Sequence, residues 1–296
     1  MINRILDFAE APAHLNVRLK QLVVRRADLP DATVPLADVA VVIAAHPQVT
    51  YTQAVLSGLA QAGGVFVACD ERHLPVGMFV PLVGHHVQTE RLAAQARAAR
   101  PLCKRLWQQI VRAKIRAQAQ TLLDLYGDDF GLLPLVSQVR SGDPQNIEAR
   151  ASRAYWPQLF ANSAFRRRSD NQDENLLLNY GYAVLRAIVA RAICGAGLHP
   201  SLGLHHHNRY NAYCLADDLM EPFRPTVDRS VVEYAGSHDA ICGVEKEAKQ
   251  HLVADLTGRY QVHGEQRTLF DTASRIAASL ADVFLGNAKE LELPEW

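Results

Sequence analysis

The sequence predicts an α+β protein, with a small N-terminal β-rich domain followed by a larger all-helical C-terminal domain. Two observations support this prediction. Short apolar runs of strand length precede Gly84, whereas residues with high helix propensity dominate after it. The chain has 296 residues, of which 49% are hydrophobic, so each part can bury a core of its own. We place the boundary at residue 86, which gives domains of residues 1–86 and 87–296.

The N-terminal domain is expected to contain a strand, a helix and a second strand in succession. Val39–Ile43 and Val65–Cys69 are apolar runs of strand length, and Met78–Leu82 is a weaker third. The stretch TQAVLSGLAQAGG lies between the first two runs. Thr52 stands where a helix N-cap is expected, and Gly63 stands where the helix would end.

The C-terminal domain shows repeated helical patterns. Residues 88–125 are rich in Ala, Gln, Leu and Arg, and Pro101 is expected to break this helical segment. No strand is predicted in this domain. Further helices are predicted at residues 146–162, 171–195, 243–257 and 265–287.

We expect a cytoplasmic protein that does not enter a membrane. The N-terminal MINRILDFAE lacks an apolar run of signal-peptide length, and no later stretch approaches a membrane span. The five cysteines are scattered singly without a C-x-x-C pair, which suits reduced thiols better than disulfides or a zinc ribbon.

Charged residues are balanced in number but not in position. Lys plus Arg and Asp plus Glu each total 31. From Arg91 to Arg116 there are eight basic residues and no acid, and from Arg150 to Arg168 there are five arginines and no acid. Such runs are either solvated helix faces or basic surfaces suited to a polyanion.

Acids cluster in the stretch HHHNRYNAYCLADDLMEP. If Leu215–Met220 is helical, Asp217, Asp218 and Glu221 can share one face, because they lie three and four residues apart. A divalent cation would offset their mutual repulsion. Pro222 disfavours a helical conformation at Glu221, so an irregular turn is expected there. The alternative is that Asp217 caps a helix whose N-terminus the other acids favour.

Histidines precede these acids. His206 lies 12 residues before Asp218 and 15 before Glu221, which leaves room for a loop to turn back onto the helix. One imidazole with two or three carboxylates suits Mn²⁺ or Mg²⁺ better than structural zinc. The alternative hypothesis is that His205 and His207 bind a zinc ion, although no cysteine spacing supports it.

Glu148 is the only acid in QNIEARASRAYW, where Arg150 and Arg153 follow it. An acid among arginines is commonly a salt-bridge partner. It can also be a metal ligand beside arginines that bind phosphate, which is the combination that a metal-dependent DNA enzyme needs.

Four segments together resemble one known family. LHHHNRYNAYCLADDLMEPFRPTVD resembles the signature of the CRISPR-associated adaptation integrases, the "Cas-one" family, and DLMEPFRP is its most specific part. NIEARASRAYWPQLF resembles the family's Glu-bearing helix, and ENLLLNYGYAVLRAIVARAICGAGLHPSLG its long central helix and turn. PLADVAVVIAAHPQVTYTQAVLSGLAQAGGVFVACDERHLPVGMF resembles the N-terminal part of the branch found beside a single-protein effector nuclease, the type II branch.

This resemblance implies an activity and a set of partners. The implied activity is that of a metal-dependent DNA endonuclease and integrase, which inserts short foreign DNA into a CRISPR array by transesterification. The implied assembly is a homodimer, formed through the N-terminal domain, two copies of which flank a dimer of the small "Cas-two" partner in a four-plus-two heterohexamer. Double-stranded DNA is the implied substrate, and type II companion proteins, including the effector nuclease, are further candidate partners.

The resemblance also implies a ligand set. The family's metal ligands fall on Glu148, His206 and Glu221, which would bind Mn²⁺ or Mg²⁺ and carry catalysis. Asp218 is kept as a further metal-site residue, and His205 is a rival to His206.

Arginines near these residues are candidates for phosphate contacts, and DNA binding through them should weaken steeply with salt. A noncatalytic DNA-binding scaffold is the competing hypothesis, and a metal-dependent hydrolase of small phosphoesters is a weaker third. The candidate arginines are Arg150, Arg153, Arg166, Arg167, Arg168, Arg209 and Arg224.

Overall fold

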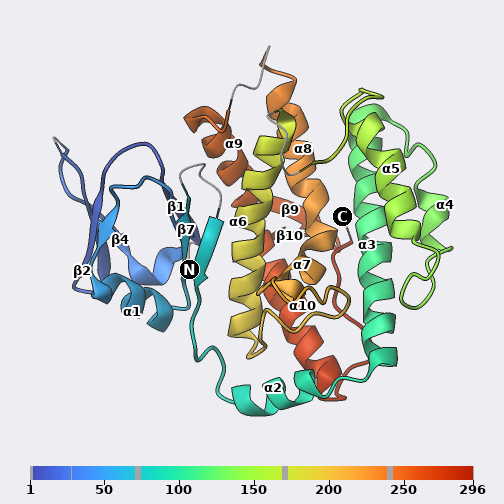
Figure 1. Ribbon diagram of the computed structural model, residues 1–296, viewed down its shortest axis with the longest axis horizontal. Helices are drawn as coiled ribbons and strands as arrows, with labels where there is room; N and C mark the ends of the chain where they lie inside the picture. The colour runs from blue at the N-terminus through green and yellow to red at the C-terminus, as the bar shows by residue number, and fades with distance from the viewer. Residues whose placement is uncertain (1–2, 28, 71–74, 169–172, 239–242, 296) are drawn as a thin grey trace.

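The protein has a β-rich N-terminal part packed beside a bundle of helices (Figure 1). In the computed structural model, residues 3–27, 29–70, 75–168, 173–238 and 243–295 are described. The predicted boundary at residue 86 falls in the segment that links the last N-terminal strand to the first helix of the C-terminal part.

Two four-stranded sheets form the N-terminal part. The first has the order β1-β5-β7-β8, made by Arg4–Phe8 (β1), Val39–Ala44 (β5), Val65–Cys69 (β7) and Pro75–Phe79 (β8). Its first three strands are parallel and β8 is antiparallel. The second has the order β4-β3-β2-β6, made by Ala32–Pro35 (β4), Gln21–Arg25 (β3), His14–Arg18 (β2) and Thr50–Tyr51 (β6). A 3₁₀ turn, Leu36–Asp38 (η1), and one helix, Gln53–Gln61 (α1), complete this part.

The strongest apolar runs became the strands of the first sheet. β7 has the predicted bounds, β5 is one residue longer than predicted, and the weak third run is a strand shifted towards the N-terminus. Thr52 is the N-cap of α1 as predicted, but its hydroxyl makes no capping hydrogen bond. The strands β1–β4 and β6 were not predicted individually. β1, β2, β4 and β6 are short and only partly buried, whereas β3 is short but has a buried centre.

β5 is buried on both faces and joins two cores. Val42 packs into the N-terminal core with α1, whereas its neighbours Val41 and Ile43 belong to the large core shared with the helices. Side chains of adjacent strand residues point to opposite faces, so a short apolar run can serve two layers. The first sheet is therefore the middle layer between the second sheet and the helical part.

The helical part is built around α6. Asp173 caps this helix by accepting a hydrogen bond from the Asn175 amide at 3.0 Å. The helices are Gln88–Ala96 (α2), Arg100–Tyr126 (α3), Leu133–Val136 (α4), Ile147–Leu159 (α5), Glu174–Gly195 (α6), Cys214–Met220 (α7), Arg224–Ala235 (α8), Lys246–Leu256 (α9) and Leu269–Phe284 (α10), with a 3₁₀ turn at Glu221–Phe223 (η2).

The break predicted at Pro101 is present: α2 ends at Ala96 and α3 begins at Arg100, so Pro101 lies in the first turn of the second helix, where a missing N–H costs nothing. One prediction about the helical part was wrong. The domain is not all-helical, because Arg259–Val262 (β9) and Glu265–Thr268 (β10) form an antiparallel hairpin. The helix predicted from residue 265 starts only at Leu269, after Thr268 accepts a hydrogen bond from Asp271.

One helix meets the length and composition of a membrane span, contrary to the sequence-based expectation. It is α6, the only such helix among the described residues, and 67% of its apolar window is buried within the protein. Neighbouring helices, including α8 and α10, pack around it (Figure 1). Its apolar character is therefore that of a core helix.

Close packing of α6 on α8 depends on Gly181. A Cβ built there would collide with the side chain of Val227, whereas a Cβ at Gly195, at the end of the same helix, meets nothing within 4 Å. We expect Gly181→Ala to lower the free energy of unfolding by about 1–3 kcal/mol through overpacking. Gly195→Ala, the matched control, should change it by less than about 1 kcal/mol. Chemical denaturation followed by circular dichroism measures both, and equal effects would contradict this packing argument.

Candidate functional site

The candidate site lies where α3, α5, η2 and the loop before α7 meet. Glu148 is in the first turn of α5, which Asp143 fixes by accepting the backbone N–H groups of Ile147 and Glu148, each at 2.9 Å. Glu221 begins η2 and is 4% exposed. The two predicted ligands thus reach the site from different, well-anchored elements.

Lys114, a residue that the sequence did not single out as functional, joins these two acids. Its ammonium contacts Glu148 and lies 2.6 Å from Oε2 of Glu221, and the residue is only 7% exposed. Burial alone would lower the pKa of Lys114, but Glu221 and Glu148 outweigh it and raise this pKa. Lys114 is therefore charged at neutral pH, although it is buried.

The pKa of Glu221 is held low by two cations. Burial would raise it, but Arg224 and Lys114 together keep it below its usual value. Nη2 of Arg224 lies 3.3 Å from Oε1 of Glu221, and its guanidinium lies over the ring of Tyr182. Arg224, one of the predicted phosphate contacts, is thus already paired with a candidate ligand.

His206 is oriented by Asp218. Nδ1 of His206 and Oδ1 of Asp218 are 2.6 Å apart, and this hydrogen bond raises the pKa of His206. Asp218 is fully buried and also accepts backbone N–H groups from Leu204 at 2.6 Å, His205 at 3.0 Å and His206 at 3.3 Å. An imidazole that donates from Nδ1 keeps Nε2 for a metal, so Asp218 holds the ring behind the site.

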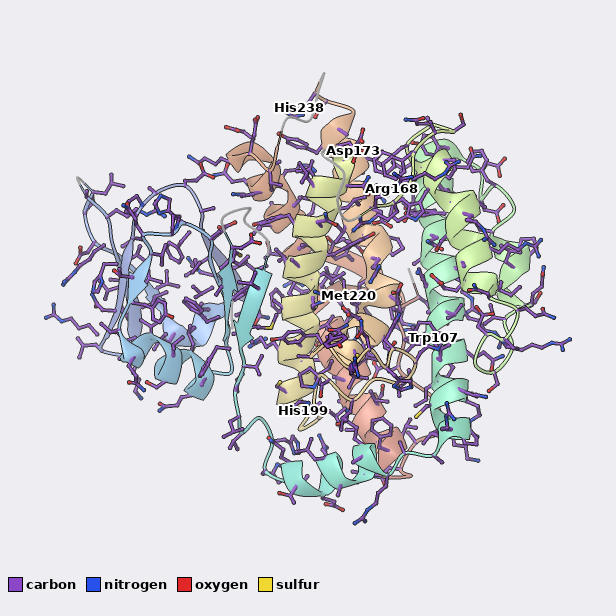
Figure 2. The ribbon with its side chains drawn as sticks, in the orientation of Figure 1. Trp107, Arg168, Asp173, His199, Met220 and His238 are labelled. Atoms are coloured by element: carbon purple, nitrogen blue, oxygen red, sulfur yellow. The ribbon has the colours of Figure 1, made fainter. Side chains whose placement is uncertain are left out.

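His205 has a different environment. Its ring stacks on that of Trp107, with centroids 4.2 Å apart and planes 3° apart. Of the three consecutive histidines, the structure therefore pairs His206, and not His205, with a carboxylate. Figure 2 shows Trp107 on α3, on the side that faces the helix bearing Met220.

Asp217 and Glu221 depart from two sequence-based expectations. Asp217 pairs with Arg186 at 2.7 Å and accepts from Asn211 at 2.6 Å, and the N-cap of α7 is Tyr213. The helix-capping alternative for Asp217 was therefore wrong. Glu221 keeps helical backbone angles before Pro222, because a single 3₁₀ turn carries the chain from α7 into α8.

The seven candidate arginines fall into two groups. Arg166, Arg167 and Arg224 are engaged with the protein itself: Arg166 donates to the carbonyls of Ser163 and Phe165, and Arg167 donates to Asn175 and Asn179. The other four have exposed side chains with fewer contacts: Arg150 donates to Gln138 at 3.3 Å, and Arg209 donates to the neighbouring Tyr210. Arg168 lies beside Asp173, at the opposite end of α6 from His199 (Figure 2). These exposed arginines are Arg150, Arg153, Arg168 and Arg209.

Asp228 forms a buried polar cluster behind the site. Its carboxyl accepts hydrogen bonds from Tyr155 at 3.1 Å and from Tyr182. Burial raises the pKa of Asp228 to about 7, because it outweighs both hydrogen bonds. Since Tyr182 lies beneath Arg224, this cluster supports the cation that pairs with Glu221. Nothing in the local sequence pattern pointed to these residues.

The predicted ligands are close but not in a compact metal-binding arrangement. Among the described residues, the one group of three with donor atoms all within 4.8 Å of one another is Glu233, His251 and Asp255, on α8 and α9. At the candidate site, the ammonium of Lys114 lies between the two glutamates instead. Two carboxylates beside an imidazole nevertheless suit Mn²⁺ or Mg²⁺.

Comparison with known proteins identifies the family. Residues 8–241 match the family model described as CRISPR associated protein Cas1. The chain belongs to the Cas1 family. It is 39% identical over 287 residues to the CRISPR-associated endonuclease Cas1 of Neisseria meningitidis serogroup C (strain 8013), a match that covers 95% of this chain and 92% of that protein. The family predicted from the sequence is confirmed.

Solved structures share the Cas1 fold. A structure described as a casposase bound to integration product has a TM-score of 0.81 at 17% identity, covering 98% of this chain and 92% of the other. A Cas6-RT-Cas1–Cas2 complex has a TM-score of 0.76 at 20% identity, covering 97% of this chain and 35% of the other. At these identities the likeness concerns the fold, and it supports a β-rich N-terminal part followed by a helical part.

The role of Lys114 as a shared cation can be tested by measuring the free energy of unfolding. We expect Lys114→Met in this Cas1 protein to lower it by about 3–5 kcal/mol, because two carboxylates lose their shared cation. Lys249→Met is the control: Lys249 is also buried, but its partner Glu10, 3.7 Å away, is half exposed to water. That change should cost about 1 kcal/mol or less. Denaturation in chelator-treated buffer compares the two, and equal losses would contradict the bridging role.

Asp228 predicts a pH dependence. Its pKa rises from 3.8 to about 7 on folding, so the folded state binds this proton more tightly than the unfolded chain. The contribution of Asp228 to stability should therefore decline as the pH rises through that range and level off above it. Asp228→Asn removes this titration. The unfolding free energy of wild type minus that of the variant should fall as the pH rises from about 4 to about 7. A constant difference would show that the pKa of Asp228 is not raised.

Proposed function

We propose that this Cas1 protein binds Mn²⁺ or Mg²⁺ through Glu148, Glu221 and Nε2 of His206, and inserts short foreign DNA into a CRISPR array. The observation that supports the proposal most is the convergence of Glu148 and Glu221 on one buried cation, the Lys114 ammonium. Two acids held together at low solvent exposure favour a cation between them. A divalent ion would supply charge stabilisation at the reacting phosphate.

Each residue of the site has a separate task in this proposal. Glu148 and Glu221 provide hard oxygen donors, and His206 provides one nitrogen. Asp218 was predicted as a further ligand, but its two oxygens already accept four hydrogen bonds from the His206 ring and three backbone amides. Its proposed role is therefore to fix the loop and the His206 tautomer. Lys114 competes with an incoming ion for both glutamates.

The reaction follows from these groups. The 3′-hydroxyl of the fragment attacks a phosphodiester at the repeat, a new P–O bond forms to the fragment, and the bond to the displaced strand breaks. Because one phosphodiester replaces another, no covalent protein intermediate is needed. With water as the nucleophile the same site would act as an endonuclease.

The proposed assembly is a homodimer that binds double-stranded DNA and a Cas2 dimer in a four-plus-two complex. Structural neighbours whose descriptions name Cas1–Cas2 complexes support the partner. Contact through the N-terminal part is proposed on the sequence resemblance. Type II companion proteins, including the effector nuclease, remain proposed partners on the sequence resemblance alone.

Strand transfer tests the catalytic assignment against the noncatalytic scaffold. A short duplex and a supercoiled plasmid carrying a CRISPR repeat are incubated with the protein, its Cas2 partner and Mn²⁺ or Mg²⁺. We expect Glu148→Gln, Glu221→Gln and His206→Ala each to lower joining by about 100-fold or more while duplex binding persists. Glutamine keeps the size of the side chain and a hydrogen bond to Lys114.

His207→Ala, a change in the exposed neighbour of His206, is the matched control and should join normally. Chelation of divalent ions should stop joining by wild type. If the protein is a noncatalytic scaffold, wild type and all variants should bind the duplex, and none of them should join it. Metal-independent joining would refute the proposed cation.

A further inference from the structure

A group of metal-ligating side chains on α8 and α9 lies outside the candidate site. One donor atom from each of Glu233, His251 and Asp255 lies within 4.8 Å of the other two. Glu233 is on α8, nine residues beyond Arg224, which corresponds to about 14 Å along a helix. An ion bound by this group would therefore be separate from an ion bound by the glutamates that contact Lys114.

Helical spacing places these donors on the facing sides of two packed helices. His251 and Asp255 are four residues apart on α9, so they share one face, and two ligands at this spacing can bind one ion. Nε2 of His251 lies 3.5 Å from Oδ2 of Asp255 and 3.2 Å from the carbonyl oxygen of Ser230 on α8. Glu233 follows Ser230 by three residues on the same helix. Oxygen atoms from both helices therefore lie around this imidazole.

The charge around the group favours a cation. Arg229 contacts Oε1 of Glu233 at 2.7 Å and Oδ2 of Asp124 at 2.9 Å, so one guanidinium serves two carboxylates. The carboxylate of Asp255 has His251 as its ion-pair partner. Three carboxylates and two arginines line the cavity beside the group, which leaves a net negative charge there when the imidazole is neutral. A divalent ion would offset this charge.

The cavity beside the group has a volume of about 600 Å³, and Glu233, Asp255 and Ser230 all line it. Ser230 is 2% exposed, and its Oγ has no hydrogen-bond partner among the described residues. A buried hydroxyl without a partner costs free energy, so it points to a water or a ligand at that position. An ion with three protein ligands keeps a position for water, and that water would supply the partner.

We propose that Glu233, His251 and Asp255 bind a divalent transition-metal ion that joins α8 to α9, with a water molecule near Ser230 in the remaining position. One imidazole and two carboxylates admit Mn²⁺, and such donors bind Zn²⁺ more tightly. Binding at Nε2 displaces the proton that the ring shares with the Ser230 carbonyl, and this proton moves to Nδ1 or to solvent. The inference is independent of the proposed function, because none of these ligands belongs to the candidate site.

The proposed role of this ion is structural. α8 begins at Arg224, which pairs with Glu221, and it also carries Asp228, which accepts a hydrogen bond from Tyr182 beneath Arg224. α9 packs on α8, and an ion shared by the two helices would restrain their separation. The ion would thus stabilise the helix that supports one of the candidate ligands.

The test measures local opening of α9 by hydrogen–deuterium exchange and mass spectrometry, with Zn²⁺ alone as the ligand. The full-length protein is first freed of metal, and exchange in peptides from α9 is followed as Zn²⁺ is added. An ion that binds only the folded helices should slow this exchange in wild type. His251→Ala and Asp255→Asn should each require at least about 10-fold more Zn²⁺ for the same slowing. Exchange in α6 without Zn²⁺ shows whether each variant is folded.

Matched variants separate this group from its surroundings. His238→Ala also removes an imidazole that packs on Tyr234, since the rings of His238 and His251 both contact that tyrosine. Glu247→Gln removes a carboxylate from the first turn of α9. Both variants should keep the wild-type response to Zn²⁺. Glu148→Gln, which alters the candidate site, should keep it as well.

Four results would overturn the inference. They are α9 exchange that Zn²⁺ does not slow in wild type, an undiminished response in His251→Ala, an undiminished response in Asp255→Asn, and an equal loss of response in His238→Ala. Loss of the response in Glu148→Gln would also overturn it, because the slowing would then come from an ion at the candidate site.

Discussion

The contact of one buried ammonium with one buried and one partly buried carboxylate is the interaction on which the site depends. Lys114 on α3, Glu148 on α5 and Glu221 on η2 come from three elements, and none of these charges is well solvated. Removing a charge from water costs several kcal/mol unless a partner compensates it. The three elements must therefore dock so that the charges meet, and the packing that achieves this also creates a position suited to a cation.

A second buried carboxylate organises the loop that faces this position. Asp218 accepts three consecutive backbone N–H groups of residues 204–206 and the Nδ1 side of His206. A loop would otherwise leave these amides without partners once it is buried. The same hydrogen bonds set the direction of two neighbouring imidazoles, so that one turns towards the acids and the other packs on Trp107. The hydrogen bonds to Asp218 therefore both satisfy the backbone N–H groups of this loop and set the direction of its imidazoles.

The helical core holds these parts in place. α6 is buried along most of its length and is packed by α7, α8 and α10, while β5 and β7 close it from the side of the sheets. Tyr182 on α6 and Asp228 on α8 form a hydrogen bond beneath Arg224, which links this core to Glu221. The charged site is therefore continuous with the apolar interior, and changes at buried positions such as Gly181 act on the elements that carry it.

The sequence alone determined the elements with strong local signals and the identity of the chemical groups. Unbroken apolar runs predicted β5 and β7, helical periodicity predicted most helices, and motif likeness selected Glu148, His206 and Glu221. Local pattern failed at the β9–β10 hairpin and at the short mixed strands, where tertiary pairing decides the conformation. Only the tertiary structure brought Lys114 between acids distant in the chain, and only it assigned Asp218 to the loop. Periodicity tells which face of a helix is buried, but the partner of a buried charge depends on how separate elements pack.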